Sequence, residues 1–177
     1  MLRKVLVALD GSVHATKALE LAIDLANMYK AELVALSVAT DSPATDEERR
    51  LAQTEYRGEV HQALSAPSFS LGPRTTESNA AALVEMSTEV GLTVRRAIGR
   101  QITMQAEMDA RKKGVATVRG RVEVGDPASA IVAVATAEKP DMLVMGSRGL
   151  GDIQGLLMGS VSHKVAHLAP CTVVTVK

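Results

Sequence analysis

A glycine- and serine-rich stretch near the C-terminal end of the chain is the part of the sequence best suited to chemistry. It contains Gly146, Gly149, Gly159 and Ser160, and a short apolar run precedes it. Glycine has no side chain, so backbone N–H groups beside it can approach an anion closely. A helix that begins at Gly159 would add unpaired N–H groups and the positive end of its dipole. The stretch therefore indicates a phosphate-binding site.

Two other interpretations of the glycines need to be weighed. The segment GLGDIQG has the spacing G-x-G-x-x-x-G, which differs from the dinucleotide-binding fingerprint, and no Walker sequence G-x-x-x-x-G-K-[ST] occurs in the chain. The glycines could instead serve only a flexible turn and a tight contact between a helix and a strand. The residues alone leave phosphate binding and this structural role both open.

Apolar runs that end in turns predict the strands that must position such a site. The runs cover residues 4–10, 31–39, 116–125, 140–147 and 171–177. Helical patterns lie between them, at residues 12–30, 126–139 and 159–169, with Ser12 and Asp126 as expected N-caps. Because buried strands alternate with helices, the sequence predicts an open five-stranded parallel sheet with helices on both faces. Ligands in such sheets bind at the carboxyl ends of the strands.

The middle of the chain is too long for one crossover connection. Residues 46–64 have the pattern of one polar helix, and the Ser/Pro/Gly-rich residues 65–78 predict a loop. Residues 79–114 are helical in composition, with a break expected near Gly91. The sequence therefore predicts a single domain over residues 1–177, with a loop and helical insertion at approximately 41–92.

The composition excludes several classes of function. Lys plus Arg equals Asp plus Glu at 20 each, so the zero net charge predicts neither a nucleic-acid partner nor an anionic membrane surface. Aromatic residues make up only 2% of the chain, which is too few for base stacking on single strands.

The histidines do not predict a metal site. His14, His61 and His167 show no metal-ligand spacing, so no zinc site is expected, and His163 is expected to be an exposed helix residue.

Localisation is also predicted from what the sequence contains. Cys171 is the single cysteine and lies in an apolar run, so we expect a buried, inert thiol. No apolar stretch reaches the roughly 18 to 20 residues needed to cross a bilayer, and the N-terminus begins with a strand pattern rather than a signal-peptide layout. The sequence predicts a cytoplasmic protein without membrane insertion.

The glycine spacing resembles a known signature. The pattern Gly146-x2-Gly149-x9-Gly159-Ser160 is similar to the nucleotide-binding signature of the universal stress protein family, in its ATP-binding branch. Residues 4–26 and 122–176 resemble the opening and closing parts of that family, whereas residues 41–92 depart from it, because family members usually have less chain there. The resemblance implies a Rossmann-like fold of the adenine nucleotide alpha hydrolase type.

The resemblance implies a role for each candidate residue. The implied ATP-binding positions are Ala8, Leu9, Asp10, Val38, Met145, Gly146, Arg148, Gly149, Gly159, Ser160, Val161 and Ser162. Asp10 would hydrogen-bond the ribose or help to hold a Mg²⁺ ion, Val38 would contact adenine, and Met145 would pack near the base or the ribose. Residues 146–149 and 159–162 would hold the phosphates from two sides.

The leading functional prediction is an ATP-binding regulatory module of the stress response with no catalytic residue. The alternative is a slow ATPase or phosphotransferase that uses the same site, to which Arg148 and Asp10 could contribute. A third hypothesis is a scaffold that acts through the insertion without a nucleotide. The resemblance further implies a homodimer formed through the last strand, at about residues 172–176, and an unidentified protein partner.

Overall fold

The computed structural model describes residues 1–65, 76–150 and 158–177. Its strands are β1 (Lys4–Ala8), β2 (Glu32–Ala39), β3 (Val118–Val124), β4 (Met142–Gly146) and β5 (Thr172–Val176). Its helices are α1 (Val13–Tyr29), α2 (Asp46–Gln53), α3 (Arg57–Leu64), α4 (Thr76–Lys112), α5 (Pro127–Glu138) and α6 (Ser160–Leu168). These elements form two compact units, of which the first contains residues 1–38 and 99–177 and the second contains residues 39–98.

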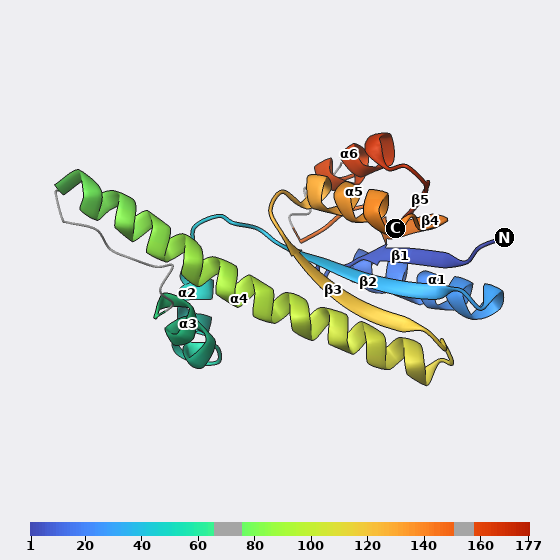
Figure 1. Cartoon of the computed structure of the whole chain (residues 1–177), viewed down its shortest axis with the longest axis horizontal. Coiled ribbons are helices and arrows are strands. Elements are labelled where there is room, and N and C mark those ends of the chain that lie inside the picture. Colours follow the sequence, from blue (N-terminus) through green and yellow to red (C-terminus); the bar gives the residue numbers. More distant parts are fainter. Residues whose placement is uncertain (66–75, 151–157) are drawn as a thin grey trace. The chain divides into compact units, whose positions relative to one another are not determined.

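The first unit is built around a five-stranded parallel sheet with the strand order β3-β2-β1-β4-β5 (Figure 1). Val5 of the central strand β1 is in register with Leu33 of β2 on one side and with Met142 of β4 on the other. The chain leaves β1 toward β2, whereas the later strands are added on the opposite side, beginning with β4. The predicted fold class is confirmed, and the strand order changes direction between β1 and β4, which is where open α/β sheets bind ligands.

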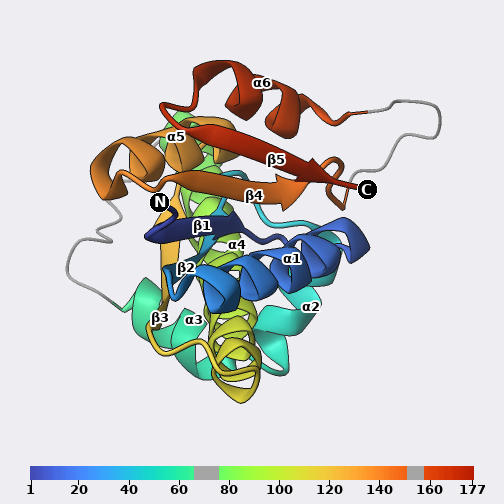
Figure 2. The ribbon, with the colours of Figure 1, turned by 90° about the vertical axis from the view of Figure 1, so that its right-hand side faces the viewer.

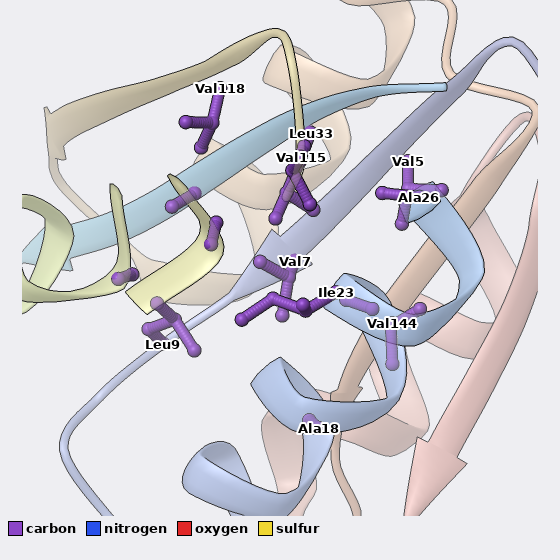
Figure 3. Packing of buried hydrophobic residues seen from close by; sticks show 14 of the residues in the cluster. Val5, Val7, Leu9, Ala18, Ile23, Ala26, Leu33, Val115, Val118 and Val144 are labelled. Carbon is purple, nitrogen blue, oxygen red and sulfur yellow. The ribbon is translucent and has the colours of Figure 1, made fainter. Parts of the chain in front are cut away.

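Helices cover both faces of this sheet (Figure 2). On one face, side chains of β1 and β4, among them Val7 and Val144, pack against Ala18 and Ile23 of α1 (Figure 3). On the other face, the core contains Leu6, Leu36, Leu143, Ile131 and Val165 from β1, β2, β4, α5 and α6. Because neighbouring residues in a strand point to opposite faces, each central strand contributes to both cores, which explains the continuous apolar runs in the sequence.

Capping residues fix where the helices of the first unit begin. The Oγ of Ser12 accepts a hydrogen bond from the Ala15 amide at 3.2 Å and starts α1. A carboxylate oxygen of Asp126 accepts one from the Ser129 amide at 3.0 Å, with Pro127 at the first position of α5. Both predicted N-caps are confirmed, and the two helix starts follow directly from the residue types at those positions.

The second unit is helical in its described part, but its helices differ from those expected. The single polar helix expected over residues 46–64 is wrong, because the chain turns between α2 and α3, where the Tyr56 amide donates to the Leu51 carbonyl at 3.0 Å. Tyr56 is 7% exposed and packs with Val60 and Val94 in a small core. The turn lets the apolar sides of both short helices contribute to that core.

The break expected in α4 near Gly91 is also wrong, since the helix is continuous from Thr76 to Lys112. The glycine serves packing instead, because a Cβ at Gly91 would lie 3.0 Å from backbone atoms of Ala44. A glycine inside a helix costs about 1 kcal/mol relative to alanine, and this close approach of two backbones within the second unit explains why it is present. Most of the loop expected over residues 65–78 lies outside the described residues.

Arg95 fixes the segment that follows β2. Its guanidinium donates to the carbonyl oxygens of Thr40 at 3.0 Å and Ser42 at 2.8 Å, and its Nε lies 2.7 Å from a carboxylate oxygen of Glu48. The same glutamate forms a capping box with Thr45 at the start of α2. One arginine on α4 therefore holds both the connecting segment and the first helix of the insertion in a defined conformation.

A network of ion pairs lies on the first unit. Glu138, at the end of α5, accepts from Lys4 of β1 at 3.1 Å, from Arg121 of β3 at 3.0 Å and from Arg119 of β3. Glu32 of β2 joins the network, with 2.8 Å between its carboxylate and Arg119. The Arg119 guanidinium, followed by the Lys4 ammonium, lowers the pKa of Glu138 from 4.5 to about 2. Three strands and one helix are thus tied together through two carboxylates.

We expect the replacement Glu138→Gln to lower the free energy of unfolding by ~1–3 kcal/mol at pH 7. A carboxylate whose pKa falls on folding stabilises the folded protein above its ordinary value, and this contribution is lost as the pH falls from about 4.5 toward 2. Urea unfolding at pH 7 and pH 3 should therefore show a smaller difference between variant and wild type at pH 3. Glu20→Gln, at an exposed position of α1, is the control, and equal losses for Glu138→Gln at both pH values would contradict the expected linkage.

Candidate functional site

A cleft of about 390 Å³ opens at the carboxyl ends of β1, β2 and β4 in the first unit. This volume lies within the range of small-molecule sites in proteins. The lining consists of Ala8, Leu9, Asp10, Ala15, Leu36, Val38, Pro127, Ile131, Met145, Gly146, Arg148, Gly149, Leu150, Gly159, Ser160, Val161 and Ser162. All twelve candidate residues from the sequence are in this set, so the structure brings together every position that the resemblance indicated.

One part of the cleft is apolar. It is formed by β2, by the end of β4 and by the N-terminal parts of α5 and α6, through Leu36, Val38, Ile131, Met145 and Val161. Met145 is 5% exposed and belongs to the core beneath α5. Aliphatic walls of this kind suit a flat, weakly polar ring such as a nucleobase.

The remaining wall is a close-packed backbone loop. A Cβ at Gly149 would lie 2.5 Å from Oδ2 of Asp10, and a Cβ at Gly146 would lie 2.9 Å both from the Arg148 carbonyl oxygen and from Cβ of His14. Atoms cannot approach so closely without displacement, so any side chain at either position would push the loop or its neighbours away. Gly146 is therefore required for this loop conformation, whereas at Gly149 a side chain would force either the Asp10 carboxylate or the loop to shift.

Asp10 links the first turn after β1 to the glycine loop. One carboxylate oxygen accepts from the Ser12 amide at 3.0 Å, and the other accepts from the Leu150 amide at 3.2 Å. The side chain is exposed, and an ionised carboxylate has about four acceptor positions. Asp10 can therefore hold the loop and still accept hydrogen bonds from a ligand or contact a cation.

The N-terminus of α6 contributes backbone donors to the cleft. Its N-cap, Gly159, has no side chain that could accept from the first-turn amides, and among the described residues no side-chain cap is present. The amides of Ser160, Val161 and Ser162 occupy the first helical positions, where no intrahelical acceptor exists. These donors, together with the helix dipole, favour an anion at this end of the cleft.

The hydroxyl of Ser162 has a structural role in this arrangement. Its Oγ donates to the Ser147 carbonyl at 2.7 Å and also contacts the Gly159 carbonyl at 3.0 Å, and the residue is 2% exposed. The Ser147 carbonyl additionally accepts from the Gly159 amide at 2.8 Å. The glycine loop is therefore joined to the start of α6 by two hydrogen bonds on one carbonyl oxygen.

The charged side chains in the described lining of the cleft are Asp10 and Arg148. Arg148 is partly buried and lies in the glycine loop, between Gly146 and Gly149. No group of three or more His, Cys, Asp or Glu that could hold a metal ion occurs in the described part of the chain. The cleft thus offers backbone amides and one guanidinium to an anion, with one carboxylate beside them.

Sequence reasoning missed five lining residues, of which Pro127 and Ile131 are the most informative. Both belong to the start of α5, and α5 follows the carboxyl end of β3. Helix starts and strand ends meet at the same edge of a parallel sheet, so the position of α5 in the sequence was the available signal. Ser147 was also missed as a structural residue: its amide donates to the Val176 carbonyl at 2.7 Å and so extends the pairing of β4 with β5.

The other singled-out residues lie outside the cleft lining. Cys171 is partly buried rather than fully buried, and burial raises the pKa of its thiol, which favours the neutral form. His163 is exposed on α6, as expected.

Among the described residues, no helix combines the length and the apolar character that crossing a bilayer requires.

Comparison of the sequence with known proteins shows the family of this chain. The sequence model of the universal stress protein family matches residues 1–177. The chain belongs to the universal stress protein family. Universal stress protein YxiE of Bacillus subtilis is 30% identical over 177 residues, which are 100% of each chain.

Solved structures of this family share the fold. A universal stress protein in complex with cAMP has a TM-score of 0.60 and 23% identity, and the match covers 99% of this chain and 97% of that one. A family member from Arabidopsis thaliana with AMP bound has a TM-score of 0.57 and 20% identity, with coverage of 99% and 91%. At these identities the likeness concerns the fold, and the nucleotides belong to those two proteins.

Proposed function

We propose that this universal stress protein binds ATP in the cleft at the carboxyl ends of β1 and β4. The observation that carries the proposal is the pairing, in one cleft, of an aliphatic pocket with the uncapped first turn of α6, which lies beside the glycine loop. The pocket suits the adenine ring, and the donors suit the phosphates. The nucleotides in the AMP and cAMP complexes of related proteins support an adenine nucleotide as the ligand class.

The residues present also fit a Mg²⁺ ion bound together with the phosphates. The four negative charges of a triphosphate face one guanidinium, that of Arg148, in the described lining. Mg²⁺ prefers oxygen ligands and is commonly held by one or two carboxylates together with substrate phosphates. Asp10 is the carboxylate available for this, directly or through water, and the ion would neutralise part of the phosphate charge.

ATP acts in this proposal as a regulatory ligand. Asp10 and the start of α6 both hold the glycine loop through hydrogen bonds. A ligand that contacts Asp10, the start of α6 and the loop would therefore favour one conformation of the loop. The size of that shift is set by the difference in ATP affinity between the two conformations.

We further propose that residues 1–177 are one cytoplasmic domain with an insertion at approximately residues 41–92. The proposal includes a homodimer formed along β5, whose side chains from Val173 to Val176 are partly exposed.

The proposal is tested by calorimetric titration of the wild-type protein with Mg-ATP, ATP plus a chelator, AMP, cAMP and adenosine. We expect saturable binding of Mg-ATP with one site per chain, weaker binding without Mg²⁺, and the weakest binding for adenosine, which lacks the phosphates. Binding of AMP or cAMP without binding of ATP would contradict ATP as the ligand and retain the nucleotide site. No saturable heat with any adenine nucleotide would contradict the site. Phosphate release above the rate of a blank reaction would favour the ATPase alternative.

A further inference from the structure

His163 and His167 form a pair on the exposed side of α6. They are four residues apart within the helix, and both side chains are exposed. Their ring centroids lie 4.7 Å apart, with the ring planes at 70° to each other. Neither residue lines the nucleotide cleft.

The geometry of the pair fits two imidazoles on one metal ion. Two histidines at positions i and i+4 of a helix lie on one face and are a known arrangement for binding zinc. Imidazole nitrogen binds Zn²⁺ at about 2.0–2.1 Å, so each ring centroid would lie roughly 3.2 Å from the ion. With an N–metal–N angle between about 90° and 110°, the two centroids would be roughly 4.5–5.2 Å apart. The observed 4.7 Å lies within this range, so the spacing of the two rings is already that of two imidazoles on one ion.

The surrounding charges are compatible with a cation. His167 lies in the last turn of α6, where the helix dipole presents partial negative charge. Lys164, the cation next to the pair in sequence, has its ammonium 3.1 Å from the carboxylate of Asp126, which offsets its charge. In the part of the chain that the structure describes, no third His, Cys, Asp or Glu completes a metal cluster. Water would therefore occupy the remaining coordination positions.

We infer that His163 and His167 form a two-histidine site for a divalent transition-metal ion that prefers nitrogen ligands, such as Zn²⁺ or Cu²⁺. Among divalent ions, Cu²⁺ should bind most tightly. Mg²⁺ prefers oxygen ligands and does not compete here, so this site is independent of the proposed nucleotide site. A bound ion joins two turns of α6 and stabilises the folded protein by mass action.

The inference is tested by titrating untagged full-length protein with Zn²⁺ by calorimetry and with Cu²⁺ by electron paramagnetic resonance. We expect one ion per chain, nitrogen hyperfine structure from two imidazoles, reversal by a chelator, and a rise in Tm with the metal. His163→Gln and His167→Gln should each weaken binding by ~100-fold, because the second imidazole no longer acts within the same molecule. His61→Gln, in α3, and Cys171→Ser are matched controls that should bind as the wild type does.

Circular dichroism establishes that each variant is folded, which is expected because both histidines are exposed. Zn²⁺ or Cu²⁺ binding that persists unchanged in the double variant His163→Gln/His167→Gln would overturn the inference. Binding that is lost in His61→Gln or Cys171→Ser would assign the metal to another site and overturn it equally. Absence of saturable binding by the wild type would have the same consequence.

Discussion

Replacing Gly149 by alanine is expected to reduce the affinity for adenine nucleotides by ~100-fold while the protein stays folded. The new Cβ would lie 2.5 Å from Oδ2 of Asp10, so either the carboxylate or the loop must move. The carboxylate is fixed by the amides of Ser12 and Leu150, so its displacement breaks at least one of these bonds. Displacement of the loop would instead withdraw its amides from the proposed phosphate site, and each hydrogen bond to a charged group contributes about 1.5–3 kcal/mol. Calorimetric titration with Mg-ATP measures the effect.

A matched control is available in α3. A Cβ at Gly58 would have no neighbour within 4 Å, so Gly58→Ala should leave nucleotide binding unchanged and stabilise the helix by about 0.5–1 kcal/mol. A double-mutant cycle with Asp10→Ala then isolates the contact, because removing the carboxylate removes the atom that the new methyl group meets. The two substitutions should therefore be clearly non-additive. Wild-type affinity in Gly149→Ala would show that the loop does not form the phosphate site.

The fold could be predicted closely from the sequence because its signals are local. The buried strands appear as uninterrupted apolar runs, and the capping residues Ser12 and Asp126 mark helix starts through their own hydrogen bonds. The errors fall in the insertion, where local signals conflict with packing. Residues 46–64 have a helical pattern throughout, but the burial of Tyr56 bends them into two helices. A glycine such as Gly91 usually weakens a helix. Here α4 continues through it, because the backbone of Ala44 lies too close to leave room for a Cβ.

The lining of the cleft could be predicted where glycine spacing or resemblance marked a residue, and not where packing alone determines it. The loop from Gly146 to Gly149 stood out in the sequence because its glycines follow a buried strand directly. Leu36 and Ile131 line the cleft as ordinary aliphatic residues of a strand and a helix, and their types say nothing about a ligand. The bond from the Leu150 amide to Asp10 joins residues 140 positions apart, so it follows only from the folded arrangement.

Replacing Leu143 by alanine is expected to lower the free energy of unfolding by about 2–5 kcal/mol, the largest effect on stability among the substitutions considered for this chain. Leu143 is 0% exposed and packs in the core that also contains Leu6 and Ile131. β4 is hydrogen-bonded to β1 and β5, so its backbone cannot shift inward to fill the space that the lost methyl groups leave. The cost therefore includes both the lost burial and most of the cavity. Urea unfolding followed by far-UV circular dichroism measures it.

The same chemical change at an exposed position separates burial from helix or strand propensity. Leu168 lies at the end of α6 and is 56% exposed, so Leu168→Ala should change stability by less than about 1 kcal/mol. Leu143 is also two residues before Met145 on the same face of β4, and the Met145 side chain lines the cleft and belongs to the same core. The cavity should therefore weaken the proposed nucleotide binding as well as stability, because Met145 in the apolar wall of the cleft would pack less tightly against its core. If Leu143→Ala proved no more destabilising than Leu168→Ala, the core between the sheet and α5 would not be packed as the structure has it.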